Sequence, residues 1–352
     1  MAETYQLYIN GTWRDASDGA TIPAVNPYDQ SVWAHIPVAT ADDVADAIAA
    51  ARDVYDRHWS KTLPGERAAL LNKLADLIDV HADRLALMET TDNGKVIRET
   101  SSQMGYSARI FRYFAGWADK MHGAVVPLDQ RDTMDLAIRE PYGVIAAITA
   151  WNSPVAILTN KLPAALAAGN CIVIKPSEHA SVTTLEIAKL AHQAGFPAGV
   201  INVVTGMADT GKALVSSPNV DKVSFTGSPA VGRSIAQAAG GNLRPVALEL
   251  GGKSPNIIFD DADFDRAMVG ALAGIFGATG QTCIAGSRLL VQRGIYDRMV
   301  DTLAARAAQI KMGDPRLMET EMGTAANEPQ FSRILSFIGE AQSDGASLVT
   351  GG

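Results

Sequence analysis

The stretch that decides the fold runs from Gly143 to Ser177 and reads GVIAAITAWNSPVAILTNKLPAALAAGNCIVIKPS. A short apolar run over 143–150 is followed by a helix-like segment over 153–169 and a second apolar run from Cys171. Such alternation predicts parallel strands, because a parallel connection needs a helix-length crossover. It continues with a helix over 183–195, strands over 200–206 and 222–228, a helix over 229–241 and a strand over 245–252. We therefore predict an α/β fold with a Rossmann-like parallel sheet, the architecture that binds dinucleotides.

The flanking segments predict further elements and a division into domains. The Asn10-Gly11 pair predicts a β-hairpin. We also expect helices from Thr40 (with Asp43 completing a capping box), from Pro64 through Leu85 and over 104–123, two strands around a charged turn over 123–140, and, after Asp260, a helix, a strand over 287–292 and a helix over 296–310. The pattern that restarts after Asp260 predicts a second domain.

Composition limits the classes of function. With 47% hydrophobic and 19% charged residues the chain is typical of soluble globular proteins, and its 352 residues exceed one ordinary core. The net charge of −8 argues against nucleic-acid binding. Two cysteines, Cys171 and Cys283, make neither a disulfide framework nor a metal pair, and no metal site is expected. The N-terminus lacks a signal-peptide pattern, so a reducing cytoplasm is expected.

Two uncharged stretches are long enough to be considered as transmembrane segments. They lie between Glu140 and Lys161 and between Arg266 and Arg288, and runs of this length can span a bilayer. Each contains polar turn formers near its middle, which a bilayer would leave unsatisfied. We therefore expect buried core around a site and no membrane partner.

Two short segments at predicted strand ends are candidates for ligand binding. FTGSPAVG (225–232) places a strand end, an N-cap serine and Pro229 where free backbone N–H groups can bind phosphate, although ordinary turns share this pattern. KPSE (175–178) places Lys175 and Glu178 at a strand end, where they could hold ribose hydroxyls or simply be solvated. Cys171, at the start of the same strand, is expected to be a small buried residue.

Three further segments carry chemistry-bearing side chains. In WNSP (151–154), Asn152 is either a cap or a donor aimed at substrate, and Lys161 on the following helix would usually be a surface residue. In VALELGGKSP, Glu249 is predicted on a buried strand, where desolvation would raise its pKa towards that of a general base; a buried ion pair is the alternative. In GATGQTCIAGSR (277–288), Cys283 is either a core filler or a thiol left open by small neighbours.

Together and in this order, WNSP, KPSE, FTGSPAVG, LELGGKSP and GQTCIAGSR resemble the signature series of the aldehyde dehydrogenase superfamily, most nearly its bacterial hydrolytic, broad-range members. The resemblance runs from YINGTWRD through GASLVTGG. It implies that Cys283 is the nucleophile and that the Asn152 amide and the Cys283 N–H bind the oxyanion. Glu249 would activate the hydrolytic water, and Lys161 would relay its proton.

The resemblance also implies cofactor, substrate and partners. The similar cofactor positions are Ile148, Thr149, Trp151, Lys175, Ser177, Glu178, Gly206, Phe225, Thr226, Gly227, Ser228, Val231, Leu250 and Gly251. A carboxylate at Glu178 favours NAD over NADP, with NADP still possible. The implied domains are an NAD-binding domain over 1–122 and 142–252, a protruding oligomerisation hairpin over 123–141 and a partial catalytic domain over 253–352. The implied substrate is a small aldehyde, and the implied assembly of the full-length form is a homodimer or homotetramer that uses the hairpin.

One feature departs from the family. Members continue past the TGG at 350–352 with the rest of the catalytic domain, including an EIFGP-type motif and a strand that pairs with a neighbouring subunit. The resemblance thus implies a C-terminally truncated catalytic domain, and we expect poor folding beyond Gly252 or aggregation. The alternatives to a hydrolytic dehydrogenase are an inactive fragment that retains nucleotide binding and an acylating, coenzyme-A-dependent enzyme, which the presence of Glu249 disfavours.

Overall fold

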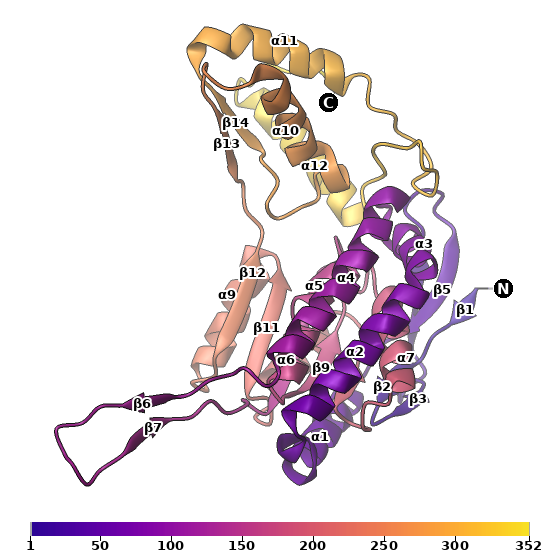
Figure 1. The fold of residues 1–352 in the computed structure, drawn as a ribbon. Helices are drawn as coiled ribbons and strands as arrows, with labels where there is room; N and C mark the ends of the chain where they lie inside the picture. The colour runs from indigo at the N-terminus through magenta and orange to yellow at the C-terminus, as the bar shows by residue number, and fades with distance from the viewer. Residues whose placement is uncertain (1, 352) are drawn as a thin grey trace.

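A seven-stranded sheet forms the centre of the molecule in a computed structural model that describes residues 2–351 (Figure 1). Its strand order is β12-β11-β8-β9-β10-β2-β3. The parallel strands are β8 (Val144–Ile148), β9 (Cys171–Lys175), β10 (Ile201–Val203), β11 (Lys222–Gly227) and β12 (Val246–Leu250). The antiparallel hairpin of β2 (Leu7–Ile9) and β3 (Thr12–Arg14) extends one edge, and its turn at Asn10-Gly11 confirms the predicted hairpin.

The order of the parallel strands contains a reversal. From β8 the chain adds β9 and β10 on one side, and then returns to add β11 and β12 on the other. This is the arrangement of dinucleotide-binding folds, in which ligands bind beyond the carboxyl ends of the strands on either side of the reversal. The predicted Rossmann-like sheet is confirmed, and the reversal lies between β8 and β11.

Helices cover this sheet, and three boundaries differ from the predictions. The helices are α1 (Ala41–Arg57), α2 (Pro64–Val80), α3 (Ala82–Asn93), α4 (Ile97–Trp117), α5 (Pro154–Thr159), α6 (Leu162–Ala167), α7 (Val182–Ala194), α8 (Ala208–Ser216) and α9 (Pro229–Gly240), with the short 3₁₀ helix η1 (Trp59–Lys61). Thr40 and Asp43 form the predicted capping box of α1. The single helix predicted from Pro64 through Leu85 is wrong, because His81 (φ −105°, ψ 13°) separates α2 from α3. The helix predicted from residue 104 begins at Ile97 instead.

The helix predicted over 153–169 is also two helices. Lys161 is the residue before α6, and Pro163 occupies the first turn of α6. Proline lacks an N–H and disfavours helical geometry in the residue before it, so it suits a helix start and breaks a helix interior. The sequence reasoning overlooked this signal, and it moves Lys161 from a helix face to a helix boundary.

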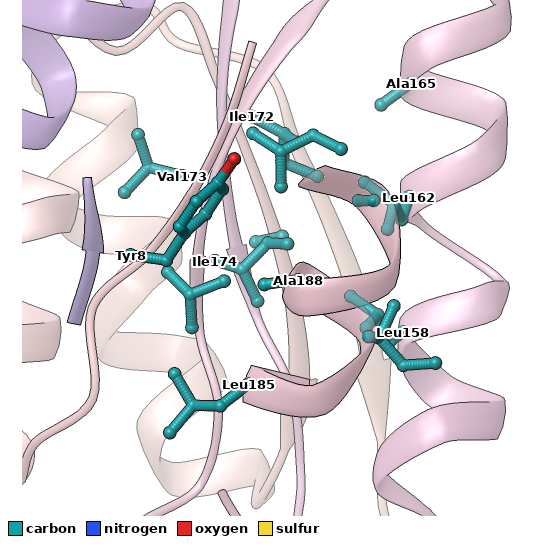
Figure 2. Packing of buried hydrophobic residues seen from close by; sticks show 14 of the residues in the cluster. Tyr8, Leu158, Leu162, Ala165, Ile172, Val173, Ile174, Leu185 and Ala188 are labelled. Atoms are coloured by element: carbon teal, nitrogen blue, oxygen red, sulfur yellow. The ribbon is translucent and has the colours of Figure 1, made fainter. Parts of the chain in front are cut away.

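The core lies around β8 and β9, whose residues are almost all buried. Figure 2 shows Ile172 and Ile174 of β9 facing Leu162 and Ala188, with Val173 on the opposite side of the strand. Apolar residues on both faces are what a parallel sheet between two helix layers requires. Cys171 is fully buried at the start of β9, as predicted.

We call residues 2–252 the large unit and residues 253–351 the small unit. The large unit also holds a three-stranded sheet of β1 (Glu3–Thr4), β5 (Val32–Pro37) and β4 (Thr21–Val25), and it projects the predicted hairpin of β6 (Ala124–Val126) and β7 (Asp135–Ala137) (Figure 1). The small unit contains the parallel pair β13 (Pro255–Ile258) and β14 (Arg288–Val291), helices α10 (Phe264–Phe276), α11 (Tyr296–Ala307) and α12 (Glu328–Ser343), and the 3₁₀ helices η2 (Gly277–Gly280) and η3 (Arg293–Ile295). The sequence reasoning missed α8, α12, β1, β4, β5 and β13.

Candidate active site

The carboxyl ends of four neighbouring parallel strands bring many of the predicted cofactor residues to one edge. Ile148 of β8 is in register with Lys175 of β9 and Phe225 of β11, and Gly227 is in register with Leu250 of β12. Neighbouring strands lie about 4.8 Å apart, so these residues form one continuous rim. The rim crosses the β8–β11 reversal, where a dinucleotide is expected.

A buried polar atom on this rim has no partner among the described residues. The Thr149 backbone N–H donates to the Lys175 carbonyl (3.1 Å), but the Thr149 hydroxyl is buried and makes no hydrogen bond there. An unpaired buried hydroxyl costs free energy, which a ligand hydrogen bond would recover. Thr149 therefore fits a polar cofactor at this rim.

The turn from β11 to α9 has the geometry of a phosphate site. Ser228 is the N-cap of α9, and its hydroxyl accepts from the Val231 N–H (3.3 Å). Gly227 and Gly232 allow close packing around this turn: an added Cβ would collide with the Phe225 ring at Gly227 and come 2.6 Å from Leu250 at Gly232. The helix dipole and free N–H groups of the first turn favour an anion here.

Lys175 and Glu178 form a pair beside the rim. Lys175 is buried, and its Nζ donates to the Pro176 carbonyl (3.0 Å) and to Glu178 Oε2 (3.5 Å). Burial lowers the pKa of Lys175, and the Glu178 carboxylate opposes this shift. The solvated-end alternative is wrong for Lys175, whereas Glu178 remains half-exposed. Of the remaining predicted cofactor residues, Ser177 and Gly206 are buried, Trp151 and Thr226 are half-buried, and Val231 and Gly251 are exposed.

Cys283 lies in an exposed turn of the small unit, between η2 and β14. The backbone just before it is unusual: Ala278, Thr279 and Gly280 all have positive φ, at 50°, 57° and 70°. For alanine and threonine this conformation is strained, and such strain persists only where neighbouring contacts impose it. Cys171 contrasts with it, since burial raises the pKa of that thiol far above its usual range. Of the two thiols only Cys283 is accessible to a substrate.

The Asn152 side chain reaches the Cys283 loop from the large unit. Its Nδ2 donates to the carbonyl oxygen of Gln281, two residues before the cysteine, at 2.8 Å. One of the two amide protons is used there, which leaves the other for a ligand. A methyl group placed on Gly252 would be 3.6 Å from the Cys283 carbonyl oxygen, so the end of the LELGG segment also borders this loop.

Lys161 and Glu249 complete the constellation, and both differ from the predictions. Lys161 is half-buried at the start of α6, not on the surface, and its Nζ donates to the Ser224 hydroxyl (2.9 Å). Burial lowers the pKa of Lys161 to about 8, against the opposing charge of Glu249. Glu249 is exposed, not buried, because β12 is the edge strand of the sheet. The strand alternation was correct, but the desolvation argument for Glu249 does not apply in this structure.

An open pocket of about 630 Å³ lies between α4 and the Cys283 loop. Thr282 and Ile284, on either side of the cysteine, form one wall, and Glu99, Ser102 and Gln103 of α4 form the other. The two chain neighbours of Cys283 thus line the pocket, whereas Cys283 itself is not among its lining residues.

The sequence reasoning missed the residues that hold these loops. Gln281 is held by both atoms of its side-chain amide. Its Oε1 accepts from the Ala326 N–H (2.9 Å), and its Nε2 donates to the Thr324 carbonyl (3.2 Å). Glu99 accepts from the Ala278 N–H with both carboxylate oxygens (3.0 and 3.1 Å). The polar cluster ETTDNGK at 89–95, just before Glu99, was the one available signal for this region, and no local pattern marks Gln281.

The fold and site define a two-unit α/β protein with an accessible thiol beside a dinucleotide-type strand rim. The model of the Aldehyde dehydrogenase family matches residues 13–352. A (Z)-2-((N-methylformamido)methylene)-5-hydroxybutyrolactone dehydrogenase from Acinetobacter baylyi is 46% identical, over 99% of this chain and 72% of that protein. The chain therefore belongs to the aldehyde dehydrogenase family.

Solved structures agree with this assignment. An NAD⁺ complex of aldehyde dehydrogenase from Bacillus cereus superposes with a TM-score of 0.97 at 39% identity, over 99% of this chain and 72% of that one. Betaine aldehyde dehydrogenase from Staphylococcus aureus, also in complex with NAD⁺, superposes with a TM-score of 0.97 at 38% identity, over 99% and 69%. The chain thus spans about 70% of the length of these relatives.

Two searches of the described residues bear on other classes of site. None of the helices within residues 2–351 is both long and apolar enough to cross a membrane. The same residues contain no group of three or more His, Cys, Asp or Glu side chains placed to hold a metal ion.

Proposed function

We propose that this protein catalyses the NAD-dependent oxidation of an aldehyde to a carboxylic acid through a covalent intermediate on Cys283. The observation that carries the proposal is the meeting of three segments: Asn152 Nδ2 contacts the Gln281 carbonyl, and Gly252 borders the Cys283 carbonyl. A thiol, an amide and the strand that bears a carboxylate, far apart in sequence, thus surround one small region.

The residues of the strand rim suit a dinucleotide. The Ser228 turn would hold the pyrophosphate, and Lys175 with Glu178 would hold the adenosine ribose. The Glu178 carboxylate would repel a 2′-phosphate, which favours NAD over NADP. The bound relatives from Bacillus cereus and Staphylococcus aureus support this choice. When bound, the nicotinamide supplies the hydride acceptor.

Chemistry on the chain's own residues follows from their positions. The Cys283 thiolate adds to the aldehyde carbon, and the new C–S bond pushes the carbonyl electrons onto oxygen. The free amide proton of Asn152 and the Cys283 N–H stabilise that oxyanion. After hydride loss the carbonyl re-forms as a Cys283 thioester. The pocket between α4 and Thr282 is where we place the aldehyde.

Hydrolysis of the thioester is assigned to Glu249 and Lys161. Glu249 takes a proton from a water molecule, the hydroxyl adds to the thioester, and collapse expels the Cys283 thiolate with a carboxylic acid. Lys161, with a pKa of about 8 and within the field of Glu249, can exchange protons with it near neutral pH. The presence of this carboxylate supports hydrolysis over transfer to coenzyme A.

The assembly and location extend this proposal. The hairpin exposes Val125, Leu136 and Ile138 around a groove of about 310 Å³, which supports its use in a homodimer or homotetramer. We assign cofactor binding to residues 2–122 and 142–252 and the nucleophile to residues 253–351, and we place the protein in the cytoplasm, where the thiol stays reduced.

The test mixes the purified protein with NAD and a panel of aliphatic and aromatic aldehydes and follows NADH absorbance. Steady turnover with acid production is expected, and it would also refute the expectation of poor folding beyond Gly252. A burst of one equivalent that then stops would mean that the thioester is not hydrolysed. NAD binding without any NADH would overturn the proposal in favour of an inactive nucleotide-binding chain.

A further inference from the structure

The junction between α3 and α4, residues 93–99, lies between the two halves of the candidate site. Side chains from this short segment contact the Asn152 loop of the large unit on one side. On the other side they contact the loop that carries Cys283 in the small unit. None of the chemistry proposed above uses these side chains.

Three side chains hold the Asn152 loop. Lys95 Nζ donates to the Ser153 hydroxyl at 2.5 Å, and Asn93 Nδ2 donates to the Trp151 carbonyl at 3.4 Å. Glu89 Oε2 accepts from the Val155 N–H at 3.1 Å. The loop is therefore held immediately before and after Asn152 by side chains that are themselves buried.

The Lys95 amine is buried with two carboxyl groups near it. Lys95 is 4% exposed and Glu89 is fully buried. Burial lowers the pKa of Lys95, against the opposing influence of Glu89 and Glu99, and burial raises the pKa of Glu89. A buried polar group is costly unless it is hydrogen-bonded, so the Lys95 amine favours the position in which it has partners. That position is against the Ser153 hydroxyl and, at 3.3 Å, the Gln103 side-chain oxygen.

Glu99 holds the Cys283 loop. Both of its carboxylate oxygens accept from the Ala278 N–H, the first residue of the left-handed run that leads to the cysteine. Charge-assisted hydrogen bonds of this kind are roughly twice as strong as neutral ones. They supply a restraint that can keep Ala278 and Thr279 in a strained conformation.

Backbone contacts fix the same junction to the small unit. The Ile97 N–H donates to the Pro315 carbonyl at 2.8 Å, and Arg98 Nη2 donates to the Glu321 carbonyl at 3.1 Å. The segment that carries Lys95 and Glu99 is thus tied to both units. Its side chains contact both the Asn152 loop and the Cys283 loop.

We propose that Lys95 and Glu99 are positioning residues, Lys95 for the Asn152 amide and Glu99 for the Cys283 loop, and that together they set the spacing between oxyanion donor and nucleophile. This inference rests on the proposed function for its kinetic consequence. The contacts themselves do not depend on that function.

Amide hydrogen exchange tests the positioning without turnover. Lys95→Met should speed exchange about tenfold or more in residues 151–158 and leave residues 278–285 unchanged; Glu99→Ala should do the reverse. Lys95→Arg and Glu99→Gln, which keep a donor and one acceptor, should restore most of the protection. The matched control is Lys73→Met, an exposed lysine of α2. Unchanged exchange, or exchange that rises equally across the large unit in a variant that still folds, would overturn the proposal.

Kinetics then separate positioning from general stability. Lys95→Met should lower kcat roughly 10- to 100-fold in the wild-type background, because a misplacement of about 1 Å has that effect. On an Asn152→Ala background the same substitution should change kcat less than about twofold, whereas Glu99→Ala should still lower it. Equal losses from Lys95→Met in both backgrounds would contradict the assignment.

Two outcomes need separate handling. If Lys95→Met unfolds the large unit, the double variant Lys95→Met with Glu89→Gln removes the buried carboxyl group left without its lysine, and it should show the same local exchange pattern relative to Glu89→Gln alone. If the wild-type protein oxidises no aldehyde, the proposed function fails, and the exchange results still decide whether Lys95 and Glu99 hold their loops.

Discussion

The large and small units differ in how much of each is buried, although both contribute to one site. The core of the large unit extends from Tyr5 to Ile235, and its strands β8 and β9 have apolar residues covered on both faces. The buried cluster of the small unit contains only Ile258, Met268, Ala271 and Met299. Within residues 2–351, the rim for the cofactor therefore lies on an extensive core, whereas the nucleophile lies beside a small buried cluster and is held through α4.

The comparison teaches where each requirement of the site is met. A binding rim needs fixed strand ends, which a deep core provides. A nucleophile needs access, and Cys283 gains it on an exposed loop whose conformation is imposed by Glu99 and Gln281. Substitutions in each unit can separate the contribution of the fixed rim from that of the exposed loop, and the largest effect is expected from the thiol.

Removing the thiol should abolish the chemistry assigned to the small unit and leave cofactor binding by the large unit intact. Cys283→Ala should abolish aldehyde oxidation, because no covalent intermediate can form, while NAD affinity measured by calorimetry stays within about twofold of wild type. Cys171→Ala is the matched control, since that residue is buried away from the site. Retained oxidation in Cys283→Ala, or loss of NAD binding, would break the comparison.

Removing the amide should show that the large unit also takes part in the chemistry. Asn152→Ala should lower kcat about 100- to 1,000-fold, the usual loss for one oxyanion donor, with little change in NAD affinity. Steady-state and NAD titration measurements on the same sample check both quantities. A change confined to KM would assign Asn152 to substrate binding instead.

Core truncation should sharpen the difference in packing. Leu74 is fully buried in α2, and Leu74→Ala should lower the unfolding free energy of the large unit by about 2–5 kcal/mol.

Hydrogen exchange measured by mass spectrometry should show the small unit opening at a lower free energy than the large unit, even in the wild-type protein. Uniform protection across both units would show that the thin core is not weak.

The smallest expected effect is a pH dependence from Lys161. Its pKa is about 8 in the folded protein and about 10.5 unfolded, so between these values the unfolded chain binds the proton more tightly. Unfolding therefore becomes less favourable as pH rises through this window, and below pH 8 the cost of the buried charge is constant. In denaturant melts, the unfolding free energy of the wild type should rise more between pH 7.5 and pH 10 than that of Lys161→Met. A variant with an identical pH profile would contradict the assignment.

The sequence predicted the parts of this account that depend on local patterns. Alternating apolar runs identified the parallel sheet, and Thr40 with Asp43 identified the start of α1. Cys283 was singled out because its neighbours are small, and Asn152 because it follows the end of a predicted strand. The boundary at Lys161 was missed although Pro163 signalled it, which is a failure to apply a local rule.

Other features could not be read from the letters. The exposure of Glu249 depends on β12 being an edge strand, which is a property of strand order and not of its own alternation. The contacts of Lys95 with Ser153 and of Glu99 with Ala278 join residues far apart in the chain, and no periodicity records them. The strained turn before Cys283 is likewise imposed by tertiary contacts.

The meeting of Cys283, Glu249 and Asn152 is tested most directly by trapping the covalent intermediate. Glu249→Gln, mixed with NAD and an aldehyde and digested, should yield an acyl adduct on the peptide that contains Cys283, together with one equivalent of NADH and no further turnover. Wild-type turnover in Glu249→Gln, or an adduct on any other residue, would contradict the account.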